Sequence, residues 1–135
     1  MTRRDALGAF ALLFETIASS AGAQTPQSNA TVVFQRDLPN LTMDDWEVTA
    51  SHVDYPPGRV GTPHKHPGFT LAYVLEGSVV AKITGQEERI YTVGQAFFEP
   101  PGSVHEVSRN ASQTQPAKLL AINLAKKGLP RTSPA

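Results

Sequence analysis

The sequence contains no cysteine. This excludes disulfides, thiolate metal ligands and cysteine nucleophiles, so that any metal site must use imidazole, carboxylate or backbone oxygen. The chain also lacks an excess of charge, because its 12 basic and 12 acidic residues cancel and no long run of either sign occurs. Without a basic face, nucleic-acid binding is not expected.

No apolar run is long enough to span a bilayer, which takes about 20 residues. The first residues instead combine a basic pair, Arg3-Arg4, an apolar stretch and a small-residue site at Ala21-Gly22-Ala23. This order is typical of a secretory signal, and the adjacent arginines resemble a twin-arginine signal. We therefore expect a signal peptide at 1–23, a linker at 24–30, a periplasmic or secreted protein, and no membrane anchor after cleavage.

The rest of the chain has no persistent helical period, and helix is predicted only in the leader. Short β-rich segments alternate with glycine and proline, which predicts an all-β sandwich or barrel. We assign the domain to 31–127 and a flexible tail to 128–135. The expected strands are 31–34, 46–54, 69–75, 78–84, 89–93, 96–99, 104–108 and 117–124.

Three of the four histidines occur in constrained surroundings. His64 and His66 are two residues apart, and on a strand such residues point to the same face. His105 follows a Pro-Pro-Gly turn, and a barrel could bring it in from a neighbouring strand. Neutral imidazole is the commonest metal ligand in proteins. His52 has no motif around it and is expected to be a surface or packed residue.

Two spaced patterns surround these histidines. They are Gly58-x5-His64-x-His66-x3-Thr70-x6-Gly77 and Gly94-x5-Pro100-x-Gly102-x2-His105. Together these patterns resemble the two motifs of the cupin family. The resemblance covers roughly Trp46 to Leu124. It implies an all-β double-stranded β-helix (jelly-roll) barrel, a homodimer, and one divalent metal ion on His64, His66 and His105. Fe(II) is favoured, with Zn, Mn, Ni or Cu as alternatives.

The chain departs from the family pattern at two positions. Thr70 stands where the first motif usually has its glutamate ligand. Arg109 stands where the second motif has asparagine, which here follows as Asn110; this can be a local shift of one residue. Three neutral imidazoles leave a divalent ion its full charge, which favours an anionic ligand.

Three further residues are candidates for the surroundings of the metal. Glu99 is a candidate acceptor for a ligand imidazole or a distant fourth ligand. Thr70 and Ala72 are small and share the face of the histidine pair if the strand is regular, which would leave room for a substrate. Arg59 and Arg109 are expected to be exposed.

Three functions remain open on this basis. The first is a three-histidine, non-haem, dioxygenase-like metalloenzyme acting on a small anionic or enolisable molecule, because the resemblance extends to Fe(II) dioxygenases without the glutamate ligand. The second is a periplasmic cupin that binds a metal or small molecule without turnover. The third is a cupin isomerase or lyase.

Overall fold

The computed structural model describes residues 29–135. The chain divides into Met1–Ala30 and Thr31–Ala135, and all the elements below lie in the second unit. The expected signal peptide at 1–23 lies outside the described residues, as does most of the expected linker at 24–30. Within the described part, no helix is long and apolar enough to cross a membrane.

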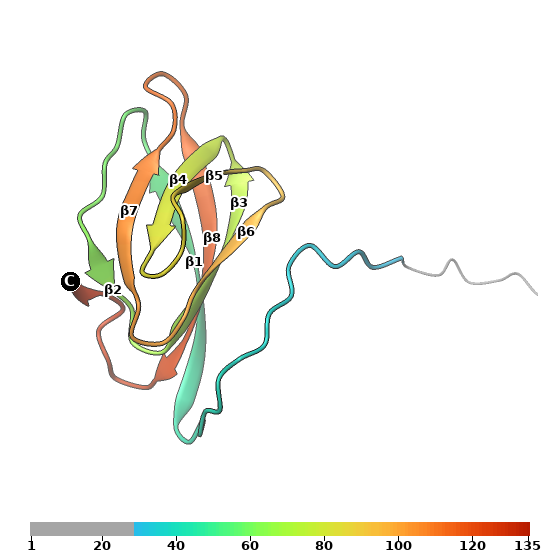
Figure 1. The fold of residues 1–135 in the computed structure, drawn as a ribbon, viewed down its shortest axis with the longest axis vertical. Helices are drawn as coiled ribbons and strands as arrows, with labels where there is room; N and C mark the ends of the chain where they lie inside the picture. Colours follow the sequence, from blue (N-terminus) through green and yellow to red (C-terminus); the bar gives the residue numbers. More distant parts are fainter. Residues whose placement is uncertain (1–28) are drawn as a thin grey trace, which may run out of the picture. The chain divides into compact units, whose positions relative to one another are not determined.

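The described residues form strands and no helix, as the sequence predicts (Figure 1). The seven longer strands coincide with β-rich segments that end at a glycine, proline or polar turn. The strands are β1 (Trp46–Tyr55), β2 (His64–Lys65), β3 (Phe69–Glu76), β4 (Ser78–Ile83), β5 (Arg89–Thr92), β6 (Ala96–Glu99), β7 (Val104–Asn110), β8 (Ala117–Lys126) and β9 (Ser133–Pro134).

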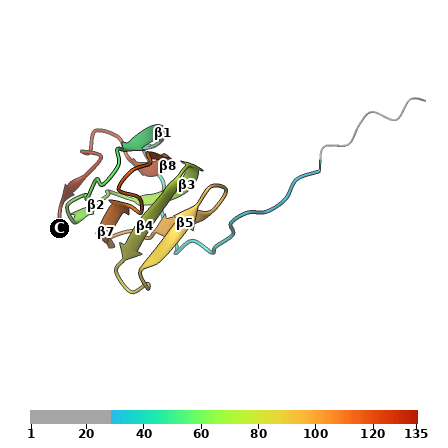
Figure 2. The same cartoon turned by 90° about the horizontal axis from the view of Figure 1, so that it is seen from above.

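Two antiparallel sheets form the two layers of the fold. The first has the strand order β1-β8-β3-β6 and the second β5-β4-β7-β2-β9. Figure 2 shows β1, β8 and β3 in one layer and β2, β7, β4 and β5 in the other. Strands distant in sequence are neighbours in space, so the predicted double-stranded β-helix is confirmed. Alternate residues of each strand face the space between the layers, where the buried apolar core lies.

The expected strand at 31–34 is wrong. Thr31–Phe34 is irregular, and Val32 and Val33 are 73% and 59% exposed. A high β propensity produces a strand only where the side chains find a surface to pack on. In this segment only Phe34 packs, with its ring centroid 6.3 Å from that of Phe98. The segment therefore lies against the barrel through one side chain instead of pairing with a sheet.

Two short strands were not expected from the sequence. β2 carries His64 and pairs with β7, while β9 pairs with the other side of β2. β9 lies within 128–135, the segment assigned above to a tail. The C-terminal residues therefore extend the second sheet, and Figure 1 shows the C-terminus beside β2.

The side chain of Asn110, at the end of β7, links the end of β1 and the loop after it to the loop between β7 and β8. Its side chain is buried, and Nδ2 lies 2.9, 3.2 and 2.7 Å from the carbonyl oxygens of Tyr55, Pro56 and Gln115. Its Oδ1 accepts a hydrogen bond from the Ser112 amide at 2.8 Å. One asparagine thus satisfies backbone groups after β1 and before β8, which holds the end of the barrel closed.

We expect Asn110→Ala to lower the free energy of unfolding by about 3 kcal/mol, because buried carbonyls and an amide would lose their partner. Chemical denaturation measures this. Arg109→Ala is the matched control: its half-exposed ion pair with Glu88, at 3.4 Å, should contribute less than about 1 kcal/mol. Equal effects of the two substitutions would contradict the anchoring role of Asn110.

Candidate metal centre

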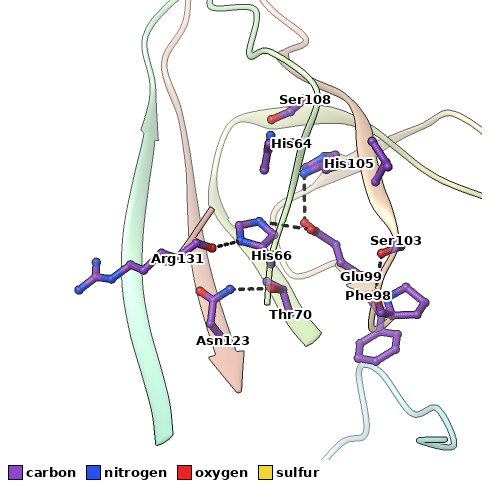
Figure 3. Close-up of polar contacts among 12 residues, drawn as sticks. His64, His66, Thr70, Phe98, Glu99, Ser103, His105, Ser108, Asn123 and Arg131 are labelled. Atoms are coloured by element: carbon purple, nitrogen blue, oxygen red, sulfur yellow. Dashed lines mark hydrogen bonds and ion pairs between the residues drawn. The ribbon is translucent and has the colours of Figure 1, made fainter. Parts of the chain in front are cut away.

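Three histidines converge between the two layers (Figure 3). His64 on β2 and His105 on β7 are directly paired in the antiparallel register, and His66 follows β2. One ligand atom from each side chain lies within 4.8 Å of the other two. The structure therefore brings together the three histidines that the sequence identified.

Each of these histidines has its Nδ1 atom next to an oxygen acceptor. The Thr62 carbonyl lies 2.8 Å from Nδ1 of His64, and the Arg131 carbonyl lies 2.7 Å from Nδ1 of His66. A Glu99 carboxylate oxygen lies 3.1 Å from Nδ1 of His105. Because a carbonyl can only accept, His64 and His66 must carry a proton on Nδ1. In the neutral rings this leaves the Nε2 lone pair free for a metal ion.

Glu99 places a carboxylate beside Thr70, which has none. In the β3–β6 pairing, Thr70 and Glu99 are opposite residues, so their side chains lie on the same face of the first sheet. Glu99 is 4% exposed. A carboxylate therefore lies on the neighbouring strand, opposite position 70 and at the same level of the barrel. The Thr70 hydroxyl instead accepts a hydrogen bond from Nδ2 of Asn123 at 2.6 Å.

The contact between Glu99 and His66 is consistent with a metal ion in the cluster. Nε2 of His66 lies 3.3 Å from the second carboxylate oxygen of Glu99. With the proton of a neutral His66 on Nδ1, this contact would bring two lone pairs together. A metal ion beside both atoms would relieve that repulsion. The pair thus fits a cation at the centre of the cluster.

Two more observations fit a metal ion. Nε2 of His105 is buried and has no hydrogen-bond partner among the described residues, although buried polar atoms are normally satisfied. Burial lowers the pKa of His64, assisted by the nearby His105 and His66, while the hydrogen bond to Thr62 opposes the shift. A neutral imidazole is the form that binds metal.

The cluster lies in the wall of a cavity of about 300 Å³. Its walls differ in chemistry, because the second sheet supplies His64, His105 and Ser108 and the first sheet supplies a largely apolar surface. That surface is formed by Val53, Tyr55, Ala72, Leu119 and Ala121, with Thr70 and Glu99 beside the histidines. A small molecule here would meet the histidines on one side and apolar groups on the other.

Polar groups that the sequence did not single out also line the cavity. The Tyr55 and Ser108 hydroxyls are buried and 2.7 Å apart. Burial raises the pKa of Tyr55, while its bond to Ser108 and the charge of Arg59 oppose the shift, so the phenol is protonated at neutral pH. The Arg59 guanidinium carbon lies 4.5 Å from the Tyr55 ring centroid, and Nη1 donates to the Asp54 carbonyl at 3.1 Å.

The other candidate residues from the sequence fall into two groups, those that line the cavity and those that do not. Thr70, Ala72 and Glu99 all line the cavity. His52 is exposed, and Arg109 pairs with Glu88 instead of lining the cavity. Arg59 is exposed as expected, yet one side of it reaches the cavity.

The sequence contained a usable indication for only some of the missed residues. Tyr55 is two residues after the inward-facing Val53, so strand alternation could have found it. Ser108 is three residues after His105 and faces the same cavity only because the β4–β7 register shifts between Lys82 and Ile83. Arg131 and Thr132, in the C-terminal segment, had no indication at all.

Comparison with known proteins identifies one family. The profile described as "Cupin domain" matches residues 51–123, more than half of the chain. The chain is 33% identical over 79 residues to "Germin-like protein subfamily 2 member 2" of Arabidopsis thaliana, covering 55% of this chain and 35% of that protein. It spans about half or less of the length of the curated relatives it matches.

Solved structures also match. The protein TT1209 of Thermus thermophilus has a TM-score of 0.51 and 32% identity, covering 66% of this chain and 80% of that one. A predicted oxalate decarboxylase of Thermotoga maritima has a TM-score of 0.50 and 26% identity, covering 57% of this chain and 64% of that one.

We expect Glu99→Gln to weaken zinc binding by about 10- to 100-fold, the usual effect of losing a group that orients a metal-ligating histidine. Glutamine keeps the size but presents an NH2 group to one of the two imidazoles. Competition with a chromophoric chelator measures the affinity. Glu106→Gln is the matched control, since Glu106 pairs with Lys82 outside the cavity. Unchanged affinity in Glu99→Gln would show that this carboxylate does not support the site.

Proposed function

The chain belongs to the cupin domain family, and we propose that it is a mononuclear metalloenzyme in which His64, His66 and His105 hold one divalent ion. The observation that carries this proposal is the arrangement of the three rings. Their Nδ1 atoms each face an oxygen, and their ligand atoms lie within 4.8 Å of one another. Fe(II) is the favoured ion, and Zn, Mn, Ni and Cu also accept imidazole ligands.

We propose that the reaction is dioxygenase-like, with both atoms of O2 entering a small anionic or enolisable molecule. When bound, the ion supplies a Lewis acid that binds an anionic oxygen or sulfur donor. With neutral imidazoles and one carboxylate, a divalent centre keeps a net positive charge. The apolar wall of the cavity lowers the local dielectric and so strengthens the attraction for an anion.

Arg59 offers a second positive group, apart from the metal ion, for binding an anionic substrate. Its guanidinium stacks on Tyr55 at the cavity wall, and Nη1 donates to the Asp54 carbonyl. The remaining donors of the guanidinium fork suit a carboxylate. We propose a substrate with one donor group for the metal and a carboxylate directed to Arg59. The similarity to a predicted oxalate decarboxylase is consistent with such small acids.

Metal content tests the first step. The purified protein should contain about one metal ion per chain, and His64→Ala and His105→Ala should each remove it, because two imidazoles bind a divalent ion far more weakly than three. Elemental analysis measures the content. His52→Ala is the matched control, since this exposed histidine lies outside the cluster. A metal-free wild-type protein that gains no thermal stability from added Fe(II), Zn or Mn would overturn the proposal.

Turnover then separates the remaining functions. Fe(II)-loaded protein should consume O2 with at least one member of a panel of β-diketones, thiols and small dicarboxylates. Conversion of a substrate without O2 would instead indicate an isomerase or lyase. Tight binding without conversion would indicate a binding protein, and either result would overturn the dioxygenase proposal.

We expect Arg59→Gln to raise the dissociation constants of oxalate and malonate for the zinc-loaded protein by about 10- to 100-fold, the range of a lost charge-assisted hydrogen bond. Zinc affinity should stay unchanged, because Arg59 contacts none of the three histidines. Calorimetric titration measures both constants. The control is Arg109→Gln, which removes a positive charge outside the cavity. Equal losses in both variants would indicate long-range charge instead of a subsite.

A further inference from the structure

The C-terminal residues after β8 return to the metal centre. The segment begins at Lys127, whose amide donates to the Asp45 carbonyl at 2.9 Å. Gly128 then turns the chain with a φ of 79°, in the left-handed region that favours glycine. The segment ends in β9, beside β2. We call residues 129–135 the C-terminal strap.

The strap supports the strand that carries His64. β2 has only two residues, and the described structure pairs it with β7 on one side and β9 on the other. His64 thus lies between His105 and Pro134 in the sheet. A two-residue strand has few hydrogen bonds of its own, so the second neighbour adds a large share of its support.

The strap also supplies the acceptor for His66. The Arg131 carbonyl lies 2.7 Å from Nδ1 of His66, across 65 residues of sequence. Figure 3 shows the carbonyl facing the ring, while the Arg131 side chain extends away from the cluster. The next residue, Thr132, lines the cavity. The backbone of the strap therefore contacts the site, and the Arg131 side chain does not.

We propose that the strap is a positioning element of the metal centre, which sets the proton of His66 on Nδ1 and directs Nε2 to the ion. Without the Arg131 carbonyl, Nδ1 would have no acceptor among the described residues, and Glu99 would compete for the ring proton at Nε2, 3.3 Å away. A proton on Nε2 removes the lone pair that the ion needs. In that tautomer Nε2 would donate its proton to Glu99. His66 could then bind the ion through Nε2 only after this hydrogen bond is broken and the proton has left.

This inference rests on the proposed metal site, and one experiment compares three chains. The variants are a truncation after Leu129 and the substitution Arg131→Ala, beside the wild type, with zinc as the probe. The truncation should weaken zinc binding by about 10- to 100-fold. Arg131→Ala keeps the carbonyl and should bind zinc as the wild type does. Wild-type affinity in a folded truncated chain would overturn the inference, as would equal losses in both variants.

A second measurement does not depend on whether the truncated chain folds. In the metal-free wild-type protein, 15N NMR of the imidazole rings should find His66 protonated at Nδ1 when the ring is neutral. A neutral His66 protonated at Nε2 would overturn the inference. If the wild type bound no metal at all, the proposed function would fail, while the NMR result would still decide whether the strap sets the tautomer.

Discussion

The antiparallel pairing of β2 with β7 is the constraint on which the site depends. It sets His64 directly opposite His105, and the two-residue period of the strand then brings His66 to the same side. The ring centroid of His64 lies 5.0 Å from that of each partner. A slip of one residue would turn His64 to the other face of the sheet. The register of a two-residue strand therefore decides whether a cluster exists.

Three separate segments then fix the orientation of the rings. Thr62 precedes β2, Glu99 ends β6 and Arg131 lies in the strap, and each supplies an oxygen to one Nδ1. Since the three oxygens lie on elements distant in sequence, the cluster is correctly oriented only when both sheets and the strap are in place. This ties the chemistry of the site to the completed fold, because no local segment contains all the groups it needs.

Sequence periodicity predicted what depends on local pattern and missed what depends on pairing. Seven of the expected strands followed from alternation and turns, while the jelly-roll barrel and the joining of His105 to the histidine pair were implied by the resemblance to the cupin motifs. The position of Glu99 opposite Thr70 could not be predicted, because a single sequence does not reveal the register between β3 and β6. The register shift between β4 and β7 leaves one extra residue between His105 and Asn110, which accounts for the asparagine standing one position late. The role of the strap could not be predicted, because a backbone carbonyl, which every residue carries, makes its contact with His66.

The pairing of β3 with β6 also affects the chemistry of the metal centre. A carboxylate on β3 would project from the strand that follows the histidine pair, whereas Glu99 projects from β6 and contacts His66 and His105 together. One acidic group thus interacts with two rings and compensates part of a bound cation's charge. Because the opposite wall of the cavity is apolar and Arg59 lies at its side, the remaining positive charge can be balanced best by a ligand that carries its own negative charge. The preference for anions that we propose thus rests on the positive charge that Glu99 leaves uncompensated, on the apolar wall and on Arg59.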